Sequence, residues 1–160
     1  TTQSQLADES GQLIATMSFQ DELKPEARGA ITELHRQGVK TIMLTGDNER
    51  SASRIARELG IDEVKANILP DEKARAVSLL KERGGIVAMV GDGINDAPAL
   101  AAADVGLAMA TGTDVAMNSA GITLLQGNPL LIPDAISISR KTYAKIKQNL
   151  FWAFIYNVIG

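Results

Sequence analysis

The stretch that decides the fold is Val90-Gly91-Asp92-Gly93-Ile94-Asn95-Asp96-Ala97-Pro98-Ala99-Leu100. It continues the apolar run at residues 86–90, which predicts a buried parallel strand. Asp92 and Asp96 follow at the carboxyl end of that strand, the edge where open α/β sheets bind their ligands. Two carboxylates there suit a hard cation such as Mg²⁺, held together with water and a phosphate oxygen. The competing interpretation is an ordinary strand-to-helix turn with an acidic helix start.

Composition limits the classes of protein that the chain can belong to. Its 160 residues suffice for about one domain with a real core. A net charge of −3 gives no basis for binding nucleic acid through bulk electrostatics. The chain has no cysteine, which excludes disulfides and thiolate metal sites.

Apolar runs and helical patterns alternate along the chain. The sequence predicts that residues 6–7 pair with a strand at 13–19 through a turn at 8–11, and it predicts further strands at residues 39–44, 63–66, 86–90, 105–109 and 122–125. Helices are expected to begin near Pro25 and Pro70 and to end at Gly38 and at residues 84–85. Another helix is expected to end at Gly60. A short alanine-rich helix is expected between the strands at 86–90 and 105–109, and a further helix near residues 114–119. This alternation predicts an α/β fold: a Rossmann-like, mostly parallel sheet with helices on both faces, followed by a C-terminal helix.

Three loops are expected to share one edge of this sheet. Thr45-Gly46-Asp47 offers a hydroxyl group and backbone N–H groups beside a helix start, where phosphate oxygens can bind. Lys73, early in the next helix, can reach a phosphate as a point charge. Together with Asp92 and Asp96, these groups predict a phosphoryl-transfer site. Each motif alone is weak evidence for a site, because most turns of this kind have no special function and most lysines are solvated surface residues.

The same three motifs resemble those of a known family. Met43-Leu44-Thr45-Gly46-Asp47-Asn48, Leu69-Pro70-Asp71-Glu72-Lys73 and Gly91-Asp92-Gly93-Ile94-Asn95-Asp96-Ala97-Pro98 are similar to the phosphorylation domain of P-type ATPases, which belongs to the haloacid-dehalogenase-like superfamily. The resemblance runs from about Leu13 to the end of the chain. It implies an ATP-driven ion pump that uses Mg²⁺ and ATP.

The resemblance also assigns roles to individual residues. It implies that Thr45, Gly46 and Asp47 form the loop on the phosphoryl group and that Lys73 neutralises its charge. It implies that Asp92 binds Mg²⁺ and that Asn95 and Asp96 complete the metal and phosphate shell. Asp21 is similar to the acidic hinge residue that precedes this segment in the family.

The acceptor aspartate of the family, in an Asp-Lys-Thr-Gly-Thr string, is missing. Asp8-Glu9-Ser10-Gly11-Gln12 is the nearest imitation, but the residues before it are too polar for the buried strand that must present a nucleophile. The nucleotide-binding and actuator domains are missing as well. We therefore expect residues 1–133 to be the second half of a phosphorylation domain cut from a larger transporter, whose other domains would be its partners.

The last 27 residues, 134–160, point to a membrane. The basic residues Arg140, Lys141, Lys145 and Lys147 precede an apolar and aromatic segment at residues 149–160. This pattern predicts a membrane helix entered from the cytoplasmic face but truncated here, because the segment is about half as long as a crossing requires. The alternative is an amphipathic helix docked on the domain.

The metal assignment comes from resemblance to the heavy-metal (class IB) P-type ATPases. In their copper(I)-transporting branch this helix carries a Tyr-Asn pair, matched by Tyr156 and Asn157, which implies that these residues line a Cu⁺ path. The expected function is therefore part of a copper(I) export pump that is inactive alone. Two alternatives stay open: a stand-alone soluble phosphatase with Asp8 as nucleophile, and a non-catalytic Mg²⁺-binding regulatory module. His35 is expected to be a surface residue without a role.

Overall fold

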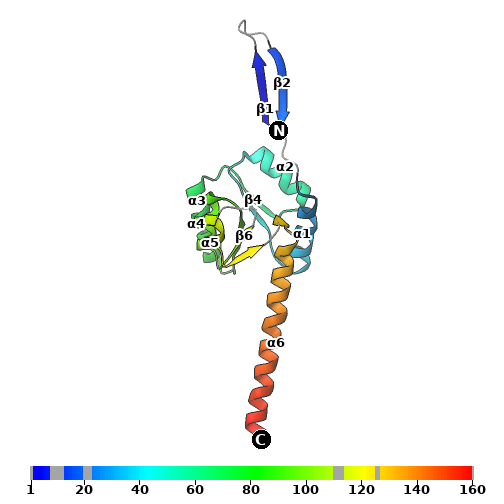
Figure 1. Ribbon diagram of the computed structural model, residues 1–160, viewed down its shortest axis with the longest axis vertical. Helices are drawn as coiled ribbons and strands as arrows, with labels where there is room; N and C mark the ends of the chain where they lie inside the picture. Colours follow the sequence, from blue (N-terminus) through cyan, green and yellow to red (C-terminus); the bar gives the residue numbers. More distant parts are fainter. Residues whose placement is uncertain (1, 8–12, 20–22, 110–113, 125–126, 160) are drawn as a thin grey trace.

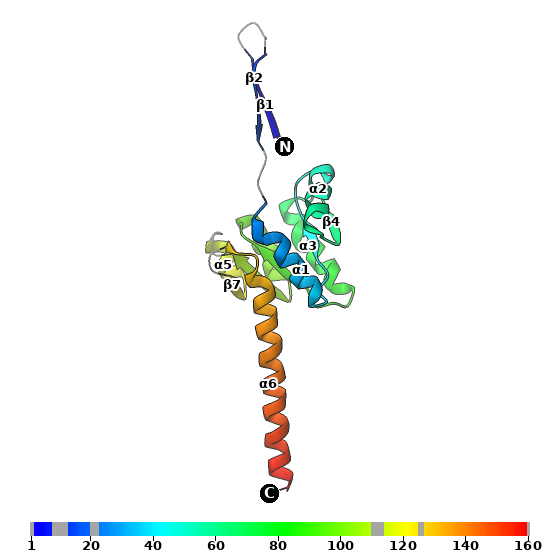
Figure 2. The ribbon, with the colours of Figure 1, turned by 90° about the vertical axis from the view of Figure 1, so that its right-hand side faces the viewer.

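The computed structural model describes residues 2–7, 13–19, 23–109, 114–124 and 127–159. An α/β body occupies the middle of the molecule, and a two-stranded hairpin and a long C-terminal helix extend from it in opposite directions (Figures 1 and 2). Figure 1 shows α3, α4 and α5 on one side of the strands and α1 and α2 on the other. The predicted α/β class, with helices on both sides, is confirmed.

The strands are β1 (Thr2–Ala7), β2 (Leu13–Phe19), β3 (Ile42–Leu44), β4 (Glu63–Lys65), β5 (Ala88–Gly91), β6 (Val105–Met109) and β7 (Ile122–Leu124). The helices are α1 (Pro25–Arg36), α2 (Glu49–Leu59), α3 (Pro70–Glu82), the 3₁₀ turn η1 (Ile94–Asp96), α4 (Ala97–Ala102), α5 (Asp114–Ser119) and α6 (Leu131–Ile159).

Strand pairing is parallel within the body but divided. β3 pairs with β4, and β5, β6 and β7 form a separate three-stranded sheet in that order. The strands β1 and β2 pair antiparallel, with Leu6 opposite Ala15. The sequence predicts the pairing of residues 6–7 with residues 13–19, but β1 begins already at Thr2. Within the described residues, β3 and β5 each have a hydrogen-bonding neighbour on one side only. The single sheet expected from the sequence is thus two parallel half-sheets.

Local signals explain where the helices begin and end. The Asn48 side chain accepts a hydrogen bond from the Ser51 N–H and caps α2. Gly60, with φ of 81°, ends that helix in the left-handed conformation that glycine adopts without a steric penalty. Pro25 and Pro70 each stand at the first position of a helix, where no backbone N–H is needed.

Two small clusters of apolar side chains stabilise the half-sheet formed by β5, β6 and β7. Leu100 of α4 packs on Ala108 of β6, with Met89 and Met117 around them. On the other side, Leu107 and Leu124 pack with the first turns of α6. Gly106 permits this packing, because a Cβ there would lie 2.8 Å from the Leu100 carbonyl oxygen.

β3 is shorter than predicted. The expectation of a strand over residues 39–44 is wrong at its start, because the strand begins only at Ile42. The N–H groups of the preceding residues are engaged elsewhere: Val39 donates to the Leu34 carbonyl and Thr41 donates to the Asp62 side chain. Because these N–H groups are already bonded, the strand pairing between β3 and β4 begins only at Ile42.

The expectation that residues 86–90 form a buried strand is also wrong. Ile86 is 89% exposed, and Ala88 and Val90 are exposed as well. The run is as apolar as the sequence indicates, but β5 lies at the edge of its half-sheet and, among the described residues, pairs with β6 alone. A parallel strand is buried when other strands flank it and both faces of its sheet are covered, and β5 has a flanking strand on one side only within the described residues.

Helix α6 leaves the body after its first turns. Pro133 is fully buried there, and its carbonyl accepts a hydrogen bond from the Gln37 side chain at 3.1 Å. Arg140 donates to the Gln37 carbonyl at 2.9 Å, and Lys24 donates to the Gly127 carbonyl at 2.8 Å. These bonds join α1 to the start of α6 and to the segment before it.

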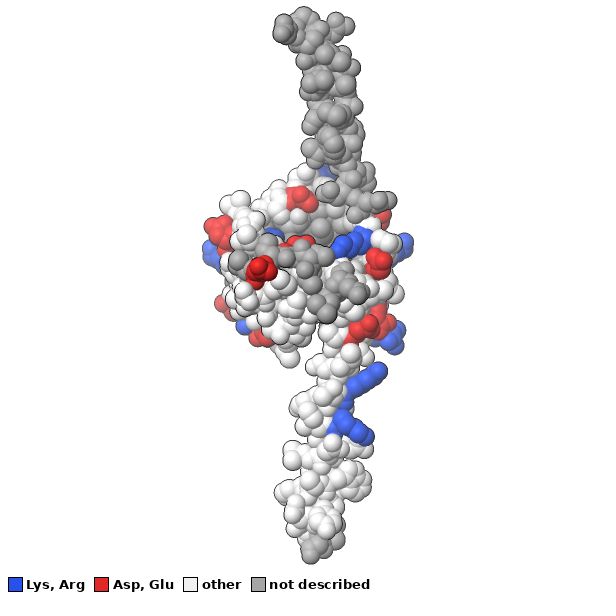
Figure 3. Space-filling view, viewed as in Figure 1, with Lys and Arg blue, Asp and Glu red and all other residues white. Residues whose placement is uncertain are grey.

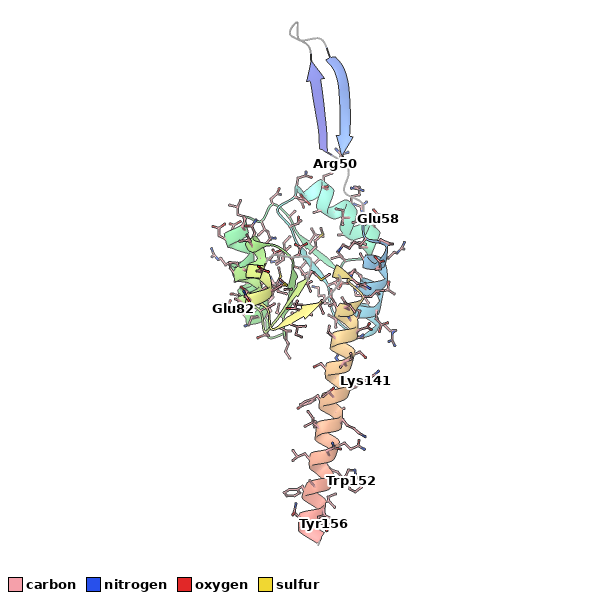
Figure 4. All side chains as sticks on the ribbon, viewed as in Figure 1. Arg50, Glu58, Glu82, Lys141, Trp152 and Tyr156 are labelled. Atoms are coloured by element: carbon pink, nitrogen blue, oxygen red, sulfur yellow. The ribbon has the colours of Figure 1, made fainter. Side chains whose placement is uncertain are left out.

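The outer half of α6 stands clear of the body. Lys141, Trp152 and Tyr156 lie along it far from the sheets (Figure 4), and Tyr156 is 79% exposed. Figure 3 shows the basic residues on its inner part and an uncharged surface beyond them. The alternative of a helix docked on the domain is therefore wrong. None of the described helices has both the length and the apolar character needed to cross a membrane.

Candidate functional site

Lys73 and Asp96 form the centre of the site. The ammonium Nζ of Lys73 donates to Asp96 Oδ1 at 2.7 Å, which joins the first turn of α3 to the end of η1. The two side chains are only 18% and 12% exposed. An ion pair this sheltered is screened less by solvent than a surface pair, so it holds both groups in place.

Gly91 makes room for Asp96. A Cβ built on Gly91 would lie 2.6 Å from the Asp96 Cβ and 2.9 Å from its Oδ2, closer than real Cβ atoms approach. The last residue of β5 must therefore lack a side chain for the carboxylate to occupy this position. Gly91 is thus required for the packing of this motif.

Asp92 and Asn95 lie beside this pair but are exposed. Asp92 follows β5 directly, and Asn95 belongs to η1. Neither side chain makes a hydrogen bond or ion pair to another described residue, in contrast to Asp96. Their oxygens are therefore accessible to a ligand from solvent.

The donor chemistry of this corner fits Mg²⁺. Within the described ranges, no three histidine, cysteine or acidic side chains come together as a metal cluster. Mg²⁺ needs no such cluster, because it is usually bound by one or two carboxylates with waters and substrate phosphates. Asp96 Oδ2 accepts no hydrogen bond from a described residue, while Oδ1 holds Lys73. One sheltered oxygen and the exposed Asp92 carboxylate therefore remain as hard ligands.

The Thr45–Asp47 loop follows the end of β3. The Asp47 N–H donates to Thr45 Oγ1 at 3.1 Å, so the hydroxyl oxygen accepts and its own proton remains available for donation. A Cβ on Gly46 would lie 3.4 Å from the Ile68 carbonyl oxygen, so the loop packs closely on the segment before α3. The loop offers a hydroxyl and a backbone N–H, as the phosphate hypothesis requires.

The structure brings only part of the predicted site into contact. Lys73 and Asp96 touch, but in the part of the chain described here Thr45 has no hydrogen bond to either of them. Asp21 lies outside the described residues. The roles of Thr45, Gly46, Asp47, Lys73, Asp92, Asn95 and Asp96 in phosphate or metal binding stay predictions.

Tyr156 and Asn157 lie on the outer half of α6. The Asn157 amide donates to the Ala153 carbonyl of the same helix at 2.8 Å. Tyr156 and Asn157 are exposed, and neither side chain makes a hydrogen bond or ion pair to another described helix or strand. Their role in a copper path also stays a prediction.

A polar cluster that the sequence analysis missed ties β3 to β4. Asp62 Oδ2 accepts from the Thr41 N–H at 2.7 Å and from its hydroxyl at 2.9 Å, and it lies 3.0 Å from His35 Nε2. These hydrogen bonds, those from Thr41 first, lower the pKa of Asp62 from 3.8 to about 2. His35 therefore has a structural partner, although it was expected to have no role. The sequence signal for this cluster was Asp62, which stands just before β4 and 21 residues after Thr41, the residue that it binds.

Comparison with known proteins gives a consistent result. A family model described as haloacid dehalogenase-like hydrolase matches residues 2–104. The copper-exporting P-type ATPase of Staphylococcus haemolyticus is 53% identical over 150 residues, which are 94% of this chain and 19% of that protein. The silver exporting P-type ATPase of Salmonella typhimurium is 52% identical over 94% of this chain and 18% of its own length. The chain spans about a fifth of the curated relatives it matches.

A solved structure agrees with these relatives. The crystal structure of a zinc-transporting PIB-type ATPase in its E2.Pi state matches with a TM-score of 0.80 and 45% identity, over 87% of this chain and 23% of that one. The three proteins are named for copper, silver and zinc, so similarity over this segment does not distinguish between cargo ions.

Proposed function

Because the chain belongs to the haloacid dehalogenase-like hydrolase family, we propose that it is the phosphate- and Mg²⁺-contacting part of the phosphorylation domain of a copper(I)-exporting P-type ATPase. In this proposal residues 1–133 belong to the phosphorylation domain and residues 134–160 lead into the membrane from its cytoplasmic face. ATP would bind to a domain outside this chain, and Cu⁺ would be the exported ion.

The observation that carries the proposal is the divided sheet with its site at the strand ends. β3 leads into Thr45, β5 leads into Asp92, and each strand has an unpaired edge among the described residues. Val90 on β5 and Ile86, two residues before this strand, expose apolar surface. A parallel apolar strand from the rest of the pump would cover that surface. If it paired with β3 and β5, its carboxyl end would bring an acceptor aspartate beside Thr45 and Asp92.

Each residue has a chemical task in this arrangement. The Thr45 hydroxyl and the Gly46 N–H would donate to phosphoryl oxygens, and Lys73 would place positive charge near them while Asp96 holds its ammonium. Asp92 and Asp96, with Asn95 beside them, would hold Mg²⁺. The bound cation would counter negative charge on the phosphoryl oxygens during transfer.

The test is phosphorylation of the complete pump and of the isolated chain. We expect the complete pump to form an acid-stable phosphoenzyme from radioactive ATP and the isolated chain to form none, because covalent catalysis requires the missing nucleophile. Lys73→Ala in the complete pump should remove most of the label. Labelling of the isolated chain, or a phosphatase activity lost in Asp8→Asn, would overturn the proposal in favour of a soluble phosphatase.

A further inference from the structure

The last residue of β4 and the turn that follows it, before α3, are hydrogen-bonded to the Thr45–Asp47 loop. The Thr45 N–H donates to the Lys65 carbonyl at 3.0 Å, and the Ile68 N–H donates to the Thr45 carbonyl at 3.0 Å. The Asn67 N–H donates to the Asp47 carbonyl at 2.8 Å. The loop therefore has its backbone position set by a segment about 20 residues further along the chain.

Asn67 has an uncommon backbone conformation in this turn. Its φ is 55°, and it is the only non-glycine residue with positive φ in the described ranges. Asparagine enters the left-handed region more readily than most residues, and a β-branched residue is strained there. Asn67 is exposed, so no packing requirement explains its conformation. The conformation directs the Asn67 N–H to the Asp47 carbonyl.

The same turn also connects the two halves of the site. It closes on Gly46, whose Cβ position lies 3.4 Å from the Ile68 carbonyl oxygen. It then enters α3 at Pro70, and Lys73 follows in the first turn of that helix. A change in the backbone at Asn67 would therefore shift the Thr45 loop relative to Lys73.

We propose that Asn67 is a positioning residue for phosphoryl binding: its left-handed backbone holds the Thr45–Asp47 loop at the distance from Lys73 that a phosphoryl group requires. This inference rests on the proposed function, since it names what sets the geometry of that site. Asn67 does not touch the phosphoryl group. It acts through the Asp47 carbonyl and the two bonds on Thr45.

The test measures the apparent affinity of the complete pump for inorganic phosphate. The readout is the concentration of radioactive inorganic phosphate that gives half-maximal phosphoenzyme, and thermal unfolding is measured on the same preparations. Asn67→Val, which strains the left-handed backbone, should raise this concentration by about fivefold or more. Asn67→Gly, which adopts the same φ freely, should stay within about twofold of the wild type. If Asn67→Val does not fold, Asn67→Ala replaces it, with a smaller rise in the same direction.

Gly60→Val is the matched control. Gly60 also has a left-handed backbone, but it ends α2 at the opposite end of β4 from Asn67. This variant should lower thermal stability and leave the phosphate concentration unchanged. The inference is overturned if Asn67→Val binds phosphate like the wild type, or if Gly60→Val weakens binding equally. A folded wild-type pump that inorganic phosphate does not label would overturn the proposed function, and the inference with it, whatever the variants do.

Discussion

The Cβ of Asp96 lies 2.6 Å from the point where a Cβ on Gly91 would be, so the position of this carboxylate depends on the absence of a side chain at the end of β5. Gly91→Ala should therefore push η1 away and lengthen the Lys73–Asp96 ion pair. We expect it to lower the free energy of unfolding by about 1–3 kcal/mol, the usual cost of overpacking. Chemical denaturation of the isolated chain measures this.

The control for this variant is Gly85→Ala. Nothing lies within 4 Å of a Cβ at Gly85, so the free energy of unfolding should change by less than about 0.5 kcal/mol. Equal stability of the two variants would show that the close approach of Gly91 and Asp96 does not constrain the site.

Asp92→Asn should separate catalysis from stability. Asp92 is exposed and bonds to no other described side chain, so the free energy of unfolding should change little. In the complete pump the same variant should slow phosphoenzyme formation at least about a hundredfold, or about 3 kcal/mol, because the proposed Mg²⁺ site would lose a negative charge. Unchanged phosphoenzyme levels with an unchanged Mg²⁺ dependence would contradict the metal assignment.

Asp96→Asn offers the contrast within the same motif. Its carboxylate is sheltered and paired with Lys73, so its loss leaves a sheltered ammonium without its partner. We expect this variant to lower both phosphoenzyme formation and the free energy of unfolding, the latter by about 1–3 kcal/mol. Denaturation curves that overlay those of Asp92→Asn would show that the ion pair contributes nothing to stability.

Asp62 should make the stability of the fold sensitive to acid. Hydrogen bonds from Thr41 and His35 lower its pKa from 3.8 to about 2 in the folded chain. Its contribution is therefore fully present above the unfolded pKa near 4 and is lost as the pH falls through about 2. Between these values, the stability of Asp62→Ala should fall less steeply with pH than that of the wild type. Parallel curves would contradict the shift.

Asn157→Ala in the complete pump tests the copper path. It should abolish copper-stimulated ATP turnover and leave phosphorylation from inorganic phosphate largely intact, because a membrane site and a cytoplasmic site are linked only through a conformational equilibrium. Asn149→Ala, two turns earlier on the same helix, is the control and should keep both activities. Loss of both activities in Asn157→Ala would indicate a packing role, and stimulation by Zn²⁺ but not Cu⁺ would overturn the copper assignment.

Elements marked by local signals could be predicted from the sequence. α1 begins at Pro25, α2 ends before Gly60, and β6 and α5 have the expected bounds. Proline and glycine act on the backbone at their own positions, so no distant partner is needed to place the start of α1 or the end of α2.

The features that depend on distant partners could not be predicted. The start of β3 depends on Asp62, 21 residues away from Thr41. The exposure of β5 depends on which strands lie beside it. In the site, the motifs placed Lys73 and Asp96 at the same edge of the sheet, but nothing in them indicated that the two side chains form an ion pair. Nothing in the local pattern around Asn67, an ordinary loop residue in sequence, indicated that its backbone would be left-handed and bonded to Asp47.

The hydrogen bond that Gln37 donates to the Pro133 carbonyl and the one that it accepts from Arg140 have a mechanical consequence for α6. Because these bonds reach Arg140, the 19 residues of α6 beyond it, 141–159, form a lever arm about 28 Å long, at 1.5 Å per residue. A tilt of only about 10° at the fastened end would sweep its tip through about 5 Å, roughly one helical turn. Small rearrangements in the α/β body are thus amplified along this arm. Loss of the hydrogen bonds at Gln37 would remove the amplification.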